Sequence, residues 1–191
     1  GGGVNKRQAQ RTLEFAERVV ARIEEANDDR SNVTGQAKSK FETRQIHADL
    51  EVRETGNGML LEGYAARFNE MSEPLPFREK IAPGAFRGTL QSRNDVKLLW
   101  NHDSNIVLGS LRSGTLRLRE DDHGLRVEAD LPPTVDGDRA RVAIQRGDVT
   151  GFSFGFTVPS GGDSWSDDGS ERTLHAVRLF EVSTGVAFPA Y

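Results

Sequence analysis

One short stretch of the chain, GDVTGFSFGF at residues 147–156, sets a serine among alternating aromatic rings. Phe152, Phe154 and Phe156 alternate with Ser153 and Gly155. Successive side chains of a strand point to opposite faces, so one face carries three rings and the other a hydroxyl beside glycine. The pattern has two interpretations: a tightly packed strand, or a strand that presents a serine nucleophile.

A serine nucleophile needs a neighbouring base, and histidine is the usual one. His102 is the best candidate because it follows the apolar run VKLLW and lies in the polar cluster NHD, where a strand ends. Ends of rigid elements commonly deliver polar residues to a site. On this pattern His102 is either a general base or a histidine in an Asn/Asp turn. Gly151 and Gly155 are expected to leave backbone N–H groups accessible to a developing oxyanion.

Other chemistries have less support. The chain has no cysteine, which excludes a disulfide framework, a thiol nucleophile and a cysteine-based zinc site. His47 is expected on the exposed side of a strand, His123 in the turn DDHG, and His175 on either face of its strand. No HxxxH or HEXXH spacing occurs, so neither a metal nor a cofactor is predicted.

Charge and hydropathy narrow the expected partners. The net charge of −4 gives no general affinity for nucleic acid. No apolar run approaches the roughly 20 residues that span a bilayer, so no membrane partner is expected. The opening GGGV lacks Met and resembles a cut from a longer chain.

The chain divides into an arm and a domain. Apolar residues recur at helical spacing over residues 5–27, and a polar segment without periodicity follows at 28–40. Residues 1–40 are therefore predicted to be a helical arm and linker, and residues 41–191 a separate domain. The helix is predicted to dock on its own domain, pair with another chain or bind a partner.

From residue 41 the apolar pattern has period two, which is typical of strands. GNG at 56–58 and DDHG at 121–124 predict hairpins, and residues 134–148 predict a helix with Thr134 as its N-cap. Seven or eight mostly antiparallel strands with short helices make a mainly β (α+β) fold. Because exposed strand edges must be protected, we expect a closed or nearly closed barrel surrounded by helices, with a two-sheet sandwich as the second choice.

Several segments occur together in an order that is familiar. They are LEGYAARFN (61–69), FREKIAPGAF (77–86), VKLLWNHD (96–103), GTLRLREDDHGLRVEADLP (114–132), GDVTGFSFGF (147–156) and VRLFEVSTGVAFPAY (177–191). From about residue 45 to the end, the chain resembles the prohead maturation proteases of tailed bacteriophages. That family is similar in fold to assemblin, the herpesvirus assembly protease, which has a barrel surrounded by helices.

The resemblance implies a serine endopeptidase that acts inside the assembling prohead, in the cytoplasm of the bacterial host. Its substrates would be the scaffold protein, the scaffolding segment of the major capsid protein, and the protease itself. A homo-oligomer is expected. The alternative is a non-catalytic assembly protein that binds scaffold or capsid protein and keeps the protease fold.

The resemblance also implies the catalytic residues. Ser153 would be the nucleophile and His102 the general base. Glu181, in RLFEVS, is the predicted third member, because a carboxylate would orient the imidazole and stabilise its charged form. Assemblin instead uses a second histidine after the serine, so His175 is the rival, with Asp103 and Asp148 as weaker ones. The chain stops at FPAY, where relatives continue into a polar tail, so it is expected to be a shortened or self-processed form.

Overall fold

The structure is a computed structural model that describes residues 39–47, 50–72 and 77–186. The predicted helix at 5–27 and most of the arm lie outside the described residues. Within them the protein is mainly β with two short helices, as the sequence predicts.

Twelve strands and two helices make up the described part of the chain. They are β1 (Phe41–His47), β2 (Glu51–Thr55), β3 (Gly58–Arg67), β4 (Arg78–Ile81), α2 (Arg87–Gln91), β5 (Lys97–Trp100), β6 (Asp103–Ser110), β7 (Leu116–Glu120), β8 (Gly124–Leu131), α3 (Val135–Gln145), β9 (Gly151–Thr157), β10 (Asp163–Trp165), β11 (Glu171–Leu174) and β12 (Arg178–Thr184).

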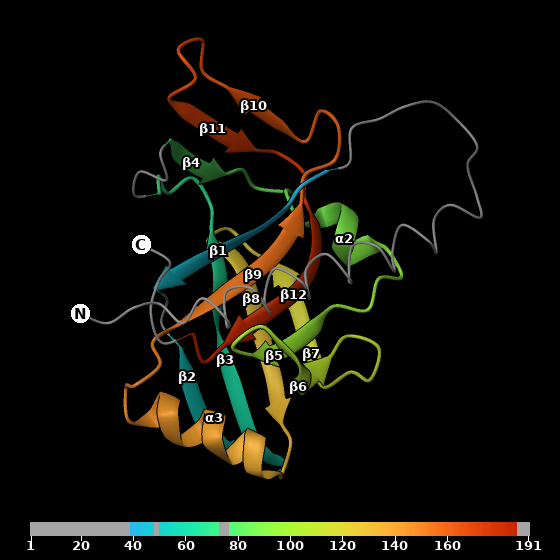
Figure 1. The fold of residues 1–191 in the computed structure, drawn as a ribbon. Coiled ribbons are helices and arrows are strands. Elements are labelled where there is room, and N and C mark those ends of the chain that lie inside the picture. Colours follow the sequence, from blue (N-terminus) through green and yellow to red (C-terminus); the bar gives the residue numbers. More distant parts are fainter. Residues whose placement is uncertain (1–38, 48–49, 73–76, 187–191) are drawn as a thin grey trace.

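The strands form three sheets. A five-stranded sheet has the order β1-β9-β12-β5-β6, a four-stranded sheet has the order β2-β3-β8-β7, and a three-stranded sheet has the order β10-β11-β4. All neighbours are antiparallel except β12 with β5 and β11 with β4, which are parallel. Figure 1 shows the three-stranded sheet at the top of the molecule and α3 at the opposite end.

The closed form of the predicted barrel is wrong, because the described strands form three separate sheets, two of which are linked by an isolated bridge between Phe68 and Ile81. The chain leaves the five-stranded sheet after His47 and enters the four-stranded sheet at Glu51. The period-two pattern that begins at residue 41 therefore continues through two strands that belong to different sheets. The five-stranded and four-stranded sheets pack face to face, which is closer to the two-sheet sandwich that was the second prediction.

The structure confirms the two predicted hairpins and the predicted helix cap, which depend on residues close together in the sequence. The GNG turn joins β2 to β3 and the DDHG turn joins β7 to β8, both as antiparallel pairs. Thr134 caps α3 by accepting a hydrogen bond from the backbone N–H of Gly137 at 3.3 Å. The strand β6 does not follow from a period-two pattern, because its sequence DSNIVLGS does not alternate cleanly.

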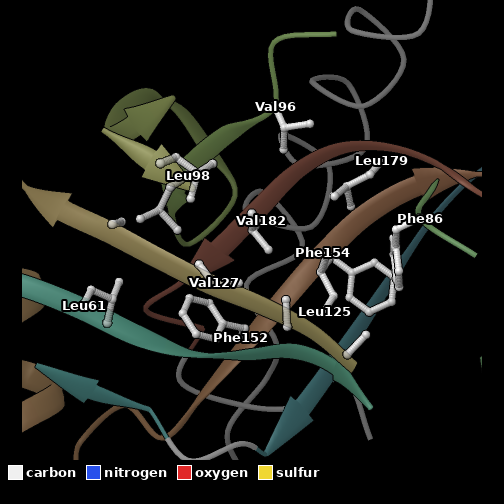
Figure 2. Packing of buried hydrophobic residues seen from close by; sticks show 14 of the residues in the cluster. Leu61, Phe86, Val96, Leu98, Leu125, Val127, Phe152, Phe154, Leu179 and Val182 are labelled. Atoms are coloured by element: carbon white, nitrogen blue, oxygen red, sulfur yellow. The ribbon is translucent and has the colours of Figure 1, made fainter. Parts of the chain in front are cut away.

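The core lies between the five-stranded and four-stranded sheets. Phe152, Phe154 and Phe156 of β9 are fully buried and belong to the same core cluster as Leu125 and Val127 of β8. Figure 2 shows Phe152 and Phe154 between these sheets. Burial of side chains this large contributes about 1.5–3 kcal/mol each, so β9 is held firmly in the interior of its sheet, between β1 and β12.

A buried network of charges ties the three-stranded sheet to β1. Arg172 of β11 is 7% exposed and bonds Glu42 of β1 at 2.8 Å and Asp163 of β10 at 2.7 Å. Arg44 of β1 bonds Glu79 of β4 at 2.6 Å. Burial alone would raise the pKa of Glu42, but the hydrogen bonds from Arg172 and Arg44 outweigh it and hold that pKa below its ordinary value.

This network predicts acid sensitivity. A carboxyl whose pKa is depressed in the folded state stabilises the fold above its unfolded-state pKa, and that stability is lost as the pH falls through the folded value. The free energy of unfolding should therefore fall as the pH drops below the ordinary 4.5 of glutamate. Glu42→Gln should lower stability at pH 7 by about 1–3 kcal/mol and flatten this acid limb.

Urea unfolding of both proteins between pH 3 and 7 measures the effect. Glu54→Gln, on an exposed position of β2, is the control and should keep the wild-type acid limb. An acid limb of unchanged slope in Glu42→Gln would contradict the prediction.

Candidate active site

Ser153 lies on the face of β9 that points away from the core. Its neighbours Phe152 and Phe154 are 0% exposed in the core, and Ser153 itself is 3% exposed. Across the ladders Ser153 stands opposite Gln45 of β1 and Ser183 of β12. Residues directly opposite in an antiparallel pair share a face, so these three side chains lie together.

A bulge in β12 brings Glu181 to this face. Leu179 pairs with Phe156 and Val182 with Phe154, so both lie on the core side. The register shift between Leu179 and Glu181 sets Glu181 opposite Gly155, two residues along β9 from Ser153. One extra residue in a bulged strand shifts the following side chains to the opposite face. Without it, Glu181 would point into the apolar core.

Gly155 makes room for this carboxylate. A Cβ at this position would lie 2.6 Å from Glu181 Oε1 and 2.4 Å from the ring of Phe41. A Cβ at Gly151 would lie 2.1 Å from the carbonyl oxygen of Ile46 on β1. A larger residue at either position would therefore collide with a neighbouring strand.

His102 reaches the same face from a tight turn. β5 runs parallel to β12, with Trp100 beside Thr184, and the chain then turns at Asn101 and His102. Their φ angles of 51° and 56° lie in the left-handed region, which Asn and His enter more often than most residues. The backbone N–H of His102 donates to Ser183 Oγ at 2.7 Å, and Ser183 Oγ donates to the carbonyl oxygen of Leu99 at 3.1 Å.

His102 and Glu181 are in direct contact. Nδ1 of His102 lies 2.7 Å from Oε1 of Glu181, and the two side chains are 12% and 5% exposed. A carboxylate only accepts, so Nδ1 carries the proton of the neutral ring. Nε2 is then left with a free lone pair, which is the state required of a general base.

Ser153 is near this pair but not bonded to it. Within residues 39–47, 50–72 and 77–186 its hydroxyl has no hydrogen-bond partner. Catalytic hydrogen bonds are often long without substrate and tighten in the complex. The three predicted residues therefore share one face, with one contact formed and the other open.

The rival third residues lie elsewhere. His175 follows β11 and is exposed, and its Nε2 lies 2.8 Å from Ser164 Oγ of β10. Asp103 accepts from Asn105 at 2.8 Å, and Asp148 pairs with Arg146 at 2.9 Å.

The two remaining histidines are also exposed. His47 stands opposite Gly151 at the edge strand β1, and His123 lies in the hairpin turn with its ring against Tyr64. In the part of the chain that the structure describes, no group of three or more His, Asp or Glu side chains could hold a metal ion. No described helix is long and apolar enough to cross a membrane.

The sequence predicts that backbone N–H groups near Gly151 and Gly155 are accessible to an oxyanion, but neighbouring strands flank most of β9. β9 pairs with β1 along residues 151–157 and with β12 along residues 153–157. Amides with a strand on each side belong to the ladders of the sheet, which applies to residues 153–157, whereas Gly151 and Phe152 pair with β1 alone. A loop next to Ser153 is an alternative source of oxyanion donors.

Sequence reasoning missed Ser183, which holds the backbone of His102. The available signal was a second small polar residue in an otherwise apolar strand, two positions after Glu181 and hence on the same face.

Comparison with known proteins identifies a matching family model and a similar solved structure. Residues 47–191 match the family model described as caudovirus prohead serine protease. The solved structure of the bacteriophage T4 capsid assembly protease is similar in fold, with a TM-score of 0.53 and 10% sequence identity over 78% of this chain and 98% of that one. No curated protein matches the chain. Because the family model covers well over half of the sequence, the chain belongs to the caudovirus prohead serine protease family.

Proposed function

We propose that this chain is a serine endopeptidase in which Ser153 is the nucleophile, His102 the general base and Glu181 the residue that orients the base. The observation that carries the proposal is the 2.7 Å contact between His102 Nδ1 and Glu181 Oε1 on the face that also carries Ser153. Family membership supports the reaction class.

The reaction follows the serine protease scheme. Ser153 Oγ attacks the scissile carbonyl carbon while His102 Nε2 takes the hydroxyl proton. The C–N bond breaks, and the imidazolium returns the proton to the leaving amine. His102 then deprotonates a water molecule that attacks the acyl carbon, the ester bond to Ser153 breaks, and the imidazolium returns the proton to Ser153 Oγ. Glu181 stabilises the imidazolium in both steps, and backbone N–H groups of an adjacent loop stabilise the oxyanion.

The proposed substrates are the scaffold protein or the scaffolding segment of the major capsid protein, cut within the assembling prohead. The family description names the prohead, and the solved relative is a capsid assembly protease. Self-cleavage and assembly into a homo-oligomer belong to the same proposal.

The alternative is an assembly protein that keeps the fold without catalysis. The open contact between Ser153 and His102 favours it, because a nucleophile that never meets its base is not activated.

Ser153→Ala separates the two functions. The variant should lower cleavage of co-expressed capsid and scaffold proteins by at least about 10³-fold while leaving the fold intact, because the attacking oxygen is gone. Gel analysis of processing, with circular dichroism of the purified variant, measures both effects. Processing at the wild-type rate would remove Ser153 from its role.

Glu181→Gln tests the orienting residue. The amide keeps the shape but can present its NH₂ to Nδ1, so the ring is no longer fixed in the productive tautomer. The cleavage rate should fall by about 10²–10⁴-fold. His175→Ala is the control and should cleave normally; the opposite pattern would move the third role to His175.

Gly155→Ala tests the space that the carboxylate occupies. The added Cβ would meet Glu181 Oε1 at 2.6 Å and the Phe41 ring at 2.4 Å, so the carboxylate must shift away from His102. The cleavage rate should fall by about 10- to 100-fold. Gly88→Ala, in α2 with no atom within 4 Å of the new Cβ, is the control. A folded Gly155→Ala protein that cleaves at the wild-type rate would contradict this account.

A further inference from the structure

A pocket of about 370 Å³ opens beside the His102–Glu181 pair. Its walls are mainly apolar and come from four strands: Phe41 of β1, Phe180 of β12, Leu99 of β5 and Val107 of β6, with Glu181 at its edge. Leu99 stands beside Ser183 and opposite Val107, so the pocket lies on the face that carries Ser153. Its volume is at the lower end of the roughly 300–1,000 Å³ of ligand pockets.

The charges at the pocket compensate one another. Lys97 Nζ lies 2.6 Å from Asp95 Oδ2, and Asp95 also accepts from the backbone N–H of Arg112 at 2.9 Å. Hydrogen bonds and the nearby charges of Lys97 and Arg112 outweigh the effect of burial and lower the pKa of Asp95, so this side chain stays ionised and paired. On this side of the pocket the charges of Asp95, Lys97 and Arg112 are therefore paired with one another.

One buried polar atom of the wall lacks a partner. Glu181 is 4% exposed, and its Oε2 has no hydrogen-bond donor within the described part of the chain. Because this oxygen is buried, the carboxylate adds little polar surface to the mainly apolar pocket. A peptide substrate brings an apolar side chain that suits such walls.

We propose that this pocket binds a large apolar side chain of the substrate, such as Leu, Ile, Met or Phe, and thereby selects the cleavage site. The proposal rests on the proposed function. Gly155, opposite Glu181, is two residues along β9 from Ser153, which corresponds to about 7 Å. An extended peptide covers that distance with about two residues, so the selected side chain lies close to the scissile bond.

Cleavage-site mapping with the full chain tests the proposal. A library of peptides from a bacterial proteome is digested, and the new termini are identified by mass spectrometry. The wild-type protein should enrich large apolar residues over alanine and aspartate at one position by about tenfold or more. Val107→Trp should fill the pocket and shift the preference at that position to small residues.

Val107 is suited to this change because it is 46% exposed and lies outside the core. The matched control is Val135→Trp at the start of α3, where the side chain is 78% exposed. This control should keep the wild-type preference.

A small fluorophosphonate probe, which needs no side-chain pocket, separates this proposal from the function on which it rests. Labelling of the wild-type protein but not of Ser153→Ala tests the nucleophile alone. A protein that is labelled but shows no apolar preference, or the same preference in Val107→Trp, overturns the pocket assignment only. A wild-type protein that is not labelled overturns the proposed function.

Discussion

The position of β12 between β9 and β5 is the constraint on which the candidate site depends. Because β12 is antiparallel to β9, it sets Glu181 and Ser183 opposite Gly155 and Ser153. Because β12 is parallel to β5, both strands end at the same edge, and the turn at Asn101 and His102 begins beside Thr184. The left-handed turn then returns the imidazole to Glu181. An antiparallel β5 would deliver the histidine to the other end of the sheet.

Burial of a carboxylate in a mainly apolar sheet needs compensation, because a charged group loses its hydration there. For Glu181 the hydrogen bond to His102 satisfies one oxygen, and Gly155 provides the space. This gives a different account of the small face of β9 from the one that the alternation suggested. Gly155 makes room for the carboxylate of Glu181, and Gly151 makes room for the backbone of β1. Ser153, between them, is the residue of this face with a reactive side chain, and its hydroxyl has no partner in the described chain.

Features that depend on neighbours in the sequence could be predicted. The alternation of Phe152, Phe154 and Phe156 is enough to place Ser153 away from the core, since the hydrophobic set must face one way. The two hairpins and the cap of α3 likewise follow from a few adjacent residues. The division of strands between sheets could not be predicted, because it depends on pairings between distant segments such as β1 with β9. The barrel was therefore the wrong choice, although the mainly β class was right.

The pairing of His102 with Glu181 shows where such reasoning stops. The two residues are 79 positions apart, and the resemblance to prohead proteases, not the residue pattern, suggested that they meet. Yet strand β12 carried a signal of its own. In a regular strand Glu181 would share a face with Leu179, two residues before it, and would therefore lie in the core. It would also lie on the opposite face from Val182, its immediate neighbour. Both apolar residues can be buried only if an extra residue lies between them, so the spacing of Leu179 and Val182 requires the bulge that turns the carboxylate toward His102.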